Sequence, residues 1–408
     1  MTDAELLIVG GGISGAALAL ALAEAGVPVA LLDRDVPPQP DAGRPLDVRV
    51  SAIHAAAAGW LMRLGAWDLI PAACRAPFGR IEVWDASSAG RIGFDSADIG
   101  QPWLGYIAEN RALVAALHAR LAQLPAARVL APAEWIDWQV EADRVRLRLA
   151  DGRDITARLL AGADGAASPL RLRAGIAAVD EPFGQWALVC HVATEQPHGD
   201  TARQRFLPTG PLAFLPLADG RSSIVWSTTP AEAQRLAALP ADEFAVELGA
   251  AFGERLGAIG AVGERAVIPL QGREAARYVG PRLALVGDAA HVVHPLAGLG
   301  ANLGLGDAAQ LAAGVIGALN ARRDPGQEHL LRAYERARRS QNLPVVRAIV
   351  GLHRLFTAAS APLRLLRGAG LLAVDRAAPL KRAFTTAACG LDDAAFGAGG
   401  RQSAAISG

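Results

Sequence analysis

The chain has 408 residues, 52% of them hydrophobic, so it is long enough to bury a large core and to form two or more domains. Its 40 basic and 40 acidic residues cancel, which gives no electrostatic reason to expect nucleic acid as a partner. No stretch reaches the roughly 18 uninterrupted apolar residues of a membrane span, and the N-terminus lacks the basic flank of a signal peptide. Cys74, Cys190 and Cys389 are widely separated, as is common in a reducing compartment. These features predict a globular, cytoplasmic protein.

The first elements expected in chain order are a strand, a glycine-rich turn, a helix and a second strand. Residues 6–9 and 29–32 are strand-like apolar runs, and residues 16–25 are good helix formers. The turn reads Gly10-x-Gly12-x-x-Gly15. Glycines at this spacing allow a tight turn and let a pyrophosphate approach a helix N-terminus closely, so the unit predicts dinucleotide binding.

An acidic residue follows the second strand of this unit. Asp33 lies where a carboxylate can bind a ribose hydroxyl, and Arg34 is next to it, so we assign both to the cofactor site. The motif leaves NAD and FAD open as the dinucleotide. An empty structural turn is the alternative.

Two later strand-like runs also end in an acidic turn. "RLLAGADGAASPLR" places Asp164 after an apolar run, and "RLALVGDAAHVVHP" places Asp288 in the same way. Open α/β sheets bind ligands at the carboxyl ends of their strands. An ordinary Asp-Gly turn is the alternative for either motif.

In combination, the motifs resemble the FAD-dependent aromatic hydroxylases, the single-component flavoprotein monooxygenases, and among them the hydroxylases of ubiquinone biosynthesis. The resemblance rests on "GGGISG", "DVRVSAIHAAAAGWLMRLGAW", "IEVWDA", "LGYIAENRAL", "GADGAASPLR", "QRFLPTGPLAFLPL" and "HPLAGLGANLGLGD". It implies an α/β fold with a Rossmann-like FAD-binding domain of the glutathione-reductase-like βαβ type. An inserted antiparallel-sheet substrate domain and C-terminal helices complete the expected architecture.

The resemblance also implies roles for individual residues. Asp288 would lie near the ribityl and pyrophosphate part of FAD, and the loop that begins at Pro295 would follow the isoalloxazine ring and end in a helix N-terminus. Arg49 would reach the FAD phosphates, Asp164 would lie near FAD and the nicotinamide donor, and Arg111 would lie near the flavin. The predicted cofactor-binding set is Gly10, Gly12, Gly15, Asp33, Arg34, Arg49, Arg111, Asp164, Asp288, Pro295, Gly298, Gly300, Ala301 and Asn302.

His294 and Leu299 are predicted to line the substrate pocket. Leu299 departs from the family, which usually has Gln there, so the polar contacts of that Gln are in question. No metal site is predicted, because His291 and His294 near Asp288 lack a fourth ligand and helical spacing. We assign no catalytic residue: a base that withdraws the phenol proton would help, but neither His191 nor Tyr278 is assigned to it.

The resemblance implies a discontinuous domain layout. The FAD-binding domain would comprise residues 1–75, 100–180 and 270–345, and the substrate domain residues 76–99 and 181–269. Short strand-like runs between residues 185 and 229 independently favour an antiparallel sheet. Residues 346–395 are expected to be helical and residues 396–408 disordered. The amphipathic, basic stretch at 360–384 predicts a helix packed on the FAD domain or, alternatively, a dock for a membrane or lipid-handling partner.

The chemistry that the resemblance implies begins with reduction of FAD by NAD(P)H, which binds transiently because no second glycine-rich nucleotide motif is present. O₂ then forms a flavin hydroperoxide that hydroxylates the ring of a polyprenyl phenol. Two alternatives stay open: a hydroxylase of a soluble aromatic or secondary metabolite, and a non-catalytic lipid-binding or chaperone protein on the same fold. Association with the inner face of the membrane or with a biosynthetic complex, the ring carbon, the prenyl length and the oligomeric state stay open too.

Overall fold

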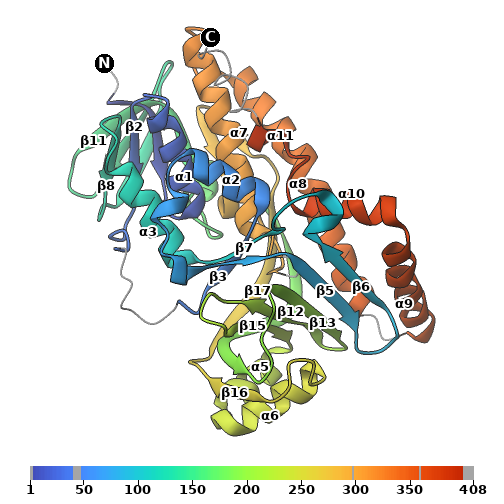
Figure 1. The fold of residues 1–408 in the computed structure, drawn as a ribbon. Helices are drawn as coiled ribbons and strands as arrows, with labels where there is room; N and C mark the ends of the chain where they lie inside the picture. The colour runs from blue at the N-terminus through green and yellow to red at the C-terminus, as the bar shows by residue number, and fades with distance from the viewer. Residues whose placement is uncertain (1–2, 40–46, 296–297, 358–359, 398–408) are drawn as a thin grey trace, which may run out of the picture.

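The computed structural model describes residues 3–39, 47–295, 298–357 and 360–397 (Figure 1). The N-terminal unit forms as predicted, with strand β1 (Ala4–Val9), helix α1 (Ile13–Glu24) and strand β2 (Val29–Leu32). Leu6, Leu7 and Ile8 are fully buried, so β1 is covered on both faces, as is usual for a parallel sheet between layers. The helix begins at Ile13, so the third glycine of the motif, Gly15, lies in its first turn.

An eight-stranded sheet is built around β1. Its strand order is β18-β19-β11-β1-β2-β8, and β9 and β10 extend it from β11. The pairs β19–β11, β11–β1, β1–β2 and β2–β8 are all parallel. The carboxyl ends of β1, β11 and β19 therefore meet at one edge, where the three acidic or glycine-rich turns begin. The remaining strands are β8 (Ala127–Leu130), β9 (Trp135–Val140), β10 (Val145–Leu149), β11 (Asp154–Gly162), β18 (Val279–Gly280) and β19 (Leu283–Leu285).

The helices α3 (Asn110–Leu121) and α7 (Gly300–Asn320) pack beside α1 (Figure 1). A three-stranded antiparallel sheet of β3 (Val50–His54), β7 (Gly105–Glu109) and β4 (Arg75–Phe78) lies next to them, and α2 (Ala55–Arg63) follows β3. These elements connect the parallel sheet to the second large sheet.

The second large sheet has nine strands in the order β20-β17-β12-β15-β14-β13-β5-β6, with β16 paired to β12. The predicted antiparallel pairing in its centre is confirmed. The pair β13–β5 is parallel, which sequence patterns did not indicate. Helices α5 (Pro230–Ala238) and α6 (Ala241–Phe252) cover one face (Figure 1). Its strands are β5 (Arg80–Asp85), β6 (Arg91–Asp95), β12 (Ala178–Thr194), β13 (Thr201–Leu207), β14 (Gly210–Pro216), β15 (Ser222–Thr228), β16 (Ile259–Val262), β17 (Ala266–Ala275) and β20 (His291–Val292).

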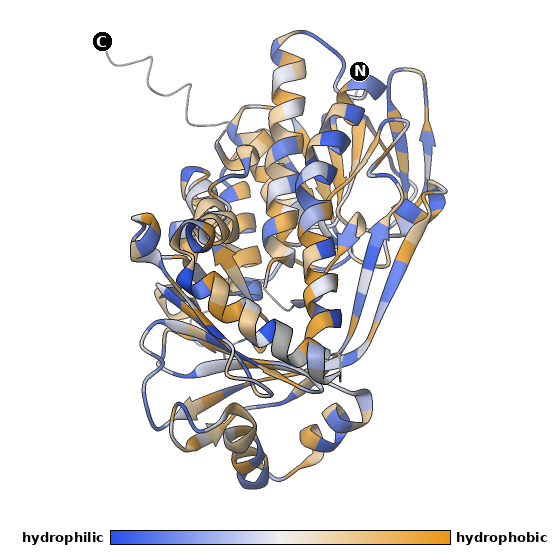
Figure 2. Ribbon diagram, turned by 90° about the vertical axis from the view of Figure 1, so that its right-hand side faces the viewer, coloured by the Kyte–Doolittle hydropathy of each residue, from blue (hydrophilic) through white to orange (hydrophobic). Residues whose placement is uncertain are grey.

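The chain ends in the helices α8 (Glu328–Thr357), α9 (Ala361–Arg376), α10 (Ala378–Ala388) and α11 (Ala394–Gly397). Figure 2 shows that the helices carry hydrophilic as well as hydrophobic positions along their length. Within the part of the chain that the structure describes, no helix is long and apolar enough to cross a membrane.

Two predictions about the C-terminal region are wrong. The stretch at 360–384 packs on the β5–β6 hairpin rather than on the FAD domain: Arg367 forms a buried ion pair with Asp85 at 2.8 Å. A buried carboxylate of the hairpin, Asp85, binds the helix that carries Arg367. The amphipathic pattern of the helix sequence could not show this distant partner. Phe396, predicted to begin a disordered tail, is buried and packs edge-on against His54 with ring centroids 5.3 Å apart. Residues 398–408 lie outside the described part of the chain.

Candidate cofactor site

The three motif glycines have different surroundings. Gly10 has φ +105°, and a Cβ there would overlap the backbone of Ala163. A Cβ on Gly15 would overlap the carbonyl oxygen of Gly10. Gly12 is exposed, and a Cβ on it would meet nothing within 4 Å. Two glycines thus serve close packing of the turn, and the third borders open space at the N-terminus of α1, which fits a pyrophosphate.

Asp33 lies against the glycine turn. Its Oδ2 accepts a hydrogen bond from the backbone N–H of Gly11, and its Oδ1 accepts one from Asp35 at 2.9 Å. Buried His118, which sequence reasoning missed, donates from Nε2 to the carbonyl of Gly11 at 2.8 Å. Arg34 is exposed and pairs with Asp35 at 3.3 Å, so its role in cofactor binding stays a prediction.

Asp164 contacts the start of the short helix α4 (Pro169–Arg173), whose N-cap is Ser168. Its two oxygens accept from the Ser168 hydroxyl at 2.6 Å and from the N–H of Leu170 at 3.0 Å, and burial raises its pKa. Arg171 is buried and donates to the carbonyls of Ala166 and Ala289 at 3.0 and 2.8 Å. The arginine therefore ties the turn after β11 to the turn after β19. Direct contact of Asp164 with FAD or a nicotinamide stays a prediction.

Asp288 is exposed between two buried neighbours, yet burial among surrounding protein atoms raises its pKa, and the charges of His291 and Arg49 offset part of that rise. The Asp288 carboxylate therefore reaches solvent while other protein atoms lie close to it. Arg49 is exposed and close enough to interact with it electrostatically. This is the geometry expected beside a bound dinucleotide.

Close backbone packing joins this turn to the helices. A Cβ on Gly287 would lie 2.6 Å from the Ser14 hydroxyl, and a Cβ on Gly304 would lie 3.2 Å from the Gly287 Cα. Because neither glycine carries a side chain, the turn after β19 fits between the N-terminal halves of α1 and α7. The structure thereby brings the first and last predicted motifs together.

The backbone N–H groups of Arg49 and Arg111 share one hydrogen-bond acceptor. The carboxylate of Asp47 accepts hydrogen bonds from the backbone N–H groups of Arg49, at 3.1 Å, and of Arg111, at 3.3 Å. Arg111 is exposed at the start of α3. Contact of its side chain with a flavin stays a prediction.

The loop before α7 is held against β3. Pro295 is exposed, and its carbonyl accepts from the N–H of Gly298 at 3.0 Å. Gly298 has φ +62°, and a Cβ there would lie 3.0 Å from the Ala52 Cβ. Gly300 and Ala301 form the first turn of α7, whose N–H groups have no partners within the helix. Leu296 and Ala297 of the predicted loop lie outside the described residues.

Asn302 has a structural role in this arrangement. The buried amide accepts from the N–H of His54 at 3.0 Å and donates to the carbonyls of Ala52 and Gly298 at 2.7 and 3.3 Å. Its side chain therefore fixes the loop to β3. Any contact of Asn302 with the cofactor would come from its backbone.

The two predicted pocket residues have different surroundings. His294 is fully buried, its Nε2 donates to Gln185 at 3.1 Å, and burial, followed by the neighbouring His353, lowers its pKa to about 3. Leu299 packs in an apolar cluster with Phe206 and Phe356. That environment suits Leu and would leave a Gln side chain without obvious polar partners.

Sequence reasoning missed a buried ion network behind the turn after β19. Asp307 accepts from the Gly287 N–H at 3.0 Å, from His291 at 2.6 Å and from Arg338 at 2.8 Å. Burial alone would raise the pKa of Asp307, but the charges and hydrogen bonds of His291 and Arg338 lower it. Asp307 is the last residue of the "NLGLGD" motif quoted above, and an acidic residue at the end of that motif was the sequence signal that could have revealed the network.

The network continues to the end of the described chain. Arg338 also pairs with Asp393 at 2.9 Å, and Asn342 donates to Asp307 at 3.0 Å. Tyr278, considered above as a base, donates to Glu274 at 2.9 Å and is fully buried. Residues from the last part of the chain thus support the turn that carries Asp288.

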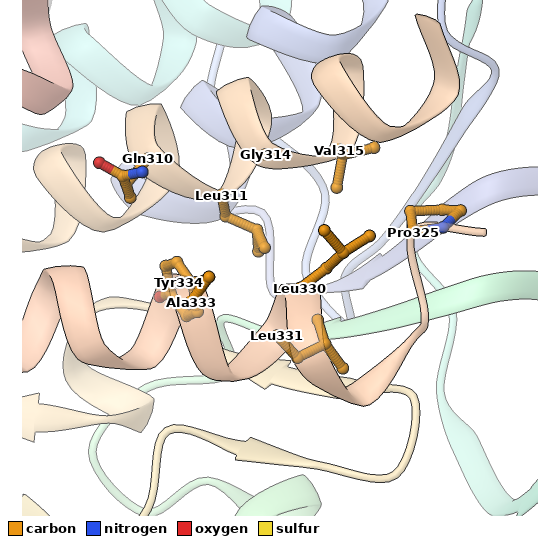
Figure 3. A pocket seen from close by; sticks show the side chains of 9 residues that line it. All are labelled: Gln310, Leu311, Gly314, Val315, Pro325, Leu330, Leu331, Ala333 and Tyr334. Atoms are coloured by element: carbon orange, nitrogen blue, oxygen red, sulfur yellow. The ribbon is translucent and has the colours of Figure 1, made fainter. Parts of the chain in front are cut away.

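His291 and His294 have separate partners, Asp307 and Gln185, and no group of three or more metal-ligating side chains gathers within the described ranges. A cavity of about 120 Å³ lies between α7 and α8 (Figure 3) and is lined by Leu311, Val315, Leu330 and others. It is too small to hold a flavin, and no residue of the glycine turn lines it.

The fold and the site define an FAD-dependent aromatic-ring monooxygenase. The sequence matches the FAD binding domain family over residues 3–349. It is 43% identical to ubiquinone hydroxylase UbiL of Rhodospirillum rubrum, covering 95% of this chain and 90% of that protein. It is 38% identical to the 3-demethoxyubiquinol 3-hydroxylase of Escherichia coli, covering 95% and 98%. The chain therefore belongs to the family of FAD-dependent hydroxylases that includes these ubiquinone enzymes.

The fold also matches solved structures. That of p-nitrophenol 4-monooxygenase PnpA from Pseudomonas putida DLL-E4 aligns with a TM-score of 0.77 at 20% identity, covering 97% of this chain and 98% of that one. That of Klebsiella pneumoniae HpxO complexed with FAD and uric acid aligns with a TM-score of 0.71 at 19% identity. Both matches support the two-sheet architecture.

Proposed function

We propose that the protein hydroxylates the aromatic ring of a polyprenyl phenol in ubiquinone biosynthesis. The observation that carries the proposal is the position of the loop before α7. It is held by β3 on one side and by the apolar cluster of Phe206, Phe356 and Leu299 on the other, in a chain whose relatives are ubiquinone hydroxylases. An apolar substrate would meet an apolar wall beside the cofactor.

Different groups of the chain serve different parts of the cofactor. When bound, FAD accepts electrons from NAD(P)H and activates O₂ for transfer of one oxygen atom to the ring. The N-terminus of α1 beside Gly12 would hold the pyrophosphate, and Arg49 and Asp288 would bind further parts of the cofactor. The free N–H groups and helix dipole at the N-terminus of α7 would stabilise negative charge on the reduced flavin. The apolar surroundings of Leu299 exclude water.

The test combines cofactor identification with genetics. The purified protein should show flavin absorption and release FAD, and its gene should restore ubiquinone in a strain that lacks a ring hydroxylase of the pathway. A Gly12→Val variant, expressed at the same level, should restore none. If the gene restores none of the hydroxylation steps, and the purified protein oxidises NADPH rapidly in the presence of a soluble hydroxybenzoate, the soluble-aromatic alternative is favoured. A colourless protein that rejects FAD would favour a non-catalytic one.

We further propose that the C-terminal helices touch a lipid surface. Leu363, Leu380 and Phe384 are 38%, 46% and 50% exposed, and Arg376 and Arg382 of the same two helices are exposed as well. Apolar and basic side chains together suit an anionic bilayer, where the substrate would reside.

A vesicle experiment tests this surface. The protein should sediment with vesicles that contain phosphatidylglycerol, less with phosphatidylcholine alone, and less at high salt. The double variant Leu380→Ser, Phe384→Ser should stay in solution. Sedimentation with neither vesicle would contradict the proposal.

A further inference from the structure

The two faces of the nine-stranded sheet differ in what covers them. On one face, Leu188, Ile224 and Trp226 pack with residues of α5 and α6 (Figure 1). Because side chains alternate along a strand, His191 of β12 and Ser223 of β15 point to the opposite face. The two residues are direct cross-strand partners, so their side chains lie next to each other.

That opposite face lies against the loop before α7. Phe206 shares an apolar cluster with Val293 and Leu299, which flank the loop. Leu215, the cross-strand partner of Ser223, packs in another apolar cluster with Ala52. Ala52 in turn borders Gly298. The loop is therefore anchored to this face on two sides, and His191 and Ser223 belong to the same face.

This face is covered unevenly: Ala187 and Val189 of β12 are buried, while part of β14 and β15 is not. Ala213, Leu215 and Val225 keep partial exposure, whereas Leu212 and Phe214, on the same strand as Ala213, are 0% and 1% exposed towards α5 and α6. The lining is apolar apart from a few polar groups. A binding site for a ring with one or two polar substituents has this composition.

His191 and Ser223 are the polar pair on this lining. They are 5% and 1% exposed, and within the described chain neither His191 Nε2 nor the Ser223 hydroxyl has a hydrogen-bond partner. Burial, followed by the charge of Arg221, lowers the pKa of His191, so the ring is neutral and offers one donor and one acceptor. Buried polar groups are nearly always paired. What distinguishes His191 and Ser223 from the equally unpaired Ser222 is that both lie on the face that borders the loop before α7.

We propose that His191 and Ser223 bind the hydroxyl oxygen of the phenolic substrate and orient its ring beside the loop before α7. The assignment rests on the proposed function. A phenol hydroxyl donates one hydrogen bond and accepts others, which matches an imidazole next to a serine hydroxyl. Ser223 reaches the ligand by rotation of its hydroxyl about χ1. Ala187, Val189 and Val225 lie on the same face and would contact the ring carbons.

The test compares two ligands that differ only in the hydroxyl group: a 2-prenylphenol with a short isoprenoid tail and the corresponding prenylbenzene. Binding to the oxidised, FAD-loaded protein is measured from the perturbation of the flavin absorption spectrum, without turnover. The wild type should prefer the phenol, and His191→Phe and Ser223→Ala should each reduce that preference at least about tenfold, as expected for a lost buried hydrogen bond.

Ser222→Ala is the matched control. Ser222 is equally buried and its hydroxyl is also unpaired within the described residues, but its side chain points to the α5–α6 face. This variant should keep the wild-type preference. If the wild type binds the phenol and both test variants keep the preference, this assignment alone is overturned. If the wild type binds neither ligand, the substrate class of the proposed function is overturned and the assignment with it.

Discussion

Replacement of Gly12 by Ala should weaken FAD binding and leave the fold nearly unchanged. Gly12 caps α1 with φ −69° and ψ −170°, a conformation open to Ala, and its new Cβ would meet nothing within 4 Å. The fold then loses only the difference between Gly and Ala at a helix N-cap, about 1 kcal/mol. A methyl group facing the pyrophosphate would break one or more charged hydrogen bonds at about 1.5–3 kcal/mol each, a roughly 10- to 150-fold rise in Kd.

Gly15→Ala provides the contrast. Its Cβ would overlap the Gly10 carbonyl oxygen and lie 3.0 Å from the Ala163 Cβ. Because the overlap is with backbone, the cost of overpacking lies at the upper end of the usual range, about 3 kcal/mol. After the roughly 1 kcal/mol gained in helix propensity, a loss of about 2 kcal/mol remains, which is more than the roughly 1 kcal/mol lost in Gly12→Ala. Urea unfolding of the FAD-free proteins measures stability, and fluorescence titration with FAD measures affinity. The reasoning fails if Gly12→Ala binds FAD like the wild type, or if it lowers the unfolding midpoint as far as Gly15→Ala does.

Four further substitutions test other parts of the structure. Asp288→Ala should lower FAD affinity by about 1–3 kcal/mol, and unchanged flavin retention on gel filtration would reject its assignment. The pKa of His294 is about 3 in the folded state against 6.5 in the unfolded state, so its contribution to stability is complete above pH 6.5 and falls at lower pH, by up to about 1.4 kcal/mol per pH unit. The melting temperature of His294→Gln should therefore fall less steeply than that of the wild type between pH 6.5 and 4.5. Equal slopes for the two proteins would contradict this. Gly314→Ala, in the interior of α7 with open space around its Cα, should raise stability by about 0.5–1 kcal/mol in urea unfolding, and a loss would show a hidden clash. Asp393→Asn should lower both the melting temperature and flavin retention by weakening its pair with Arg338. If neither quantity falls, the C-terminal residues do not support the cofactor site.

Local patterns in the sequence were sufficient for several parts of the molecule. The strand–turn–helix unit around Gly10 and the antiparallel strands between residues 185 and 229 follow from periodicity and turn residues, and the structure confirms both. The turns at Asp164 and Asp288 follow from acids placed after apolar runs. In these cases neighbours in sequence determine the structure.

Features that depend on distant partners could not be predicted. The pairing of Asp307 with Arg338 and Asp393 joins residues far apart in the chain, and an ion network has no periodicity that a sequence window could detect. The family resemblance implies that Asn302 binds the cofactor, and that stays a prediction, but the resemblance did not show that its side chain pairs with backbone groups of β3. The amphipathic pattern of α9 and α10 shows that they need a surface without showing which one.

The discontinuous parallel sheet has a consequence for how the protein is made. Strand β1 lies between β2 and β11, and the other neighbour of β11 in the sheet is β19, which is formed by residues 283–285. Arg338 and Asp393, which support the Asp288 turn, are translated later still. A nascent chain on the ribosome therefore lacks part of the FAD site until residue 393 has been synthesised, and the site is completed only after the strands that surround it.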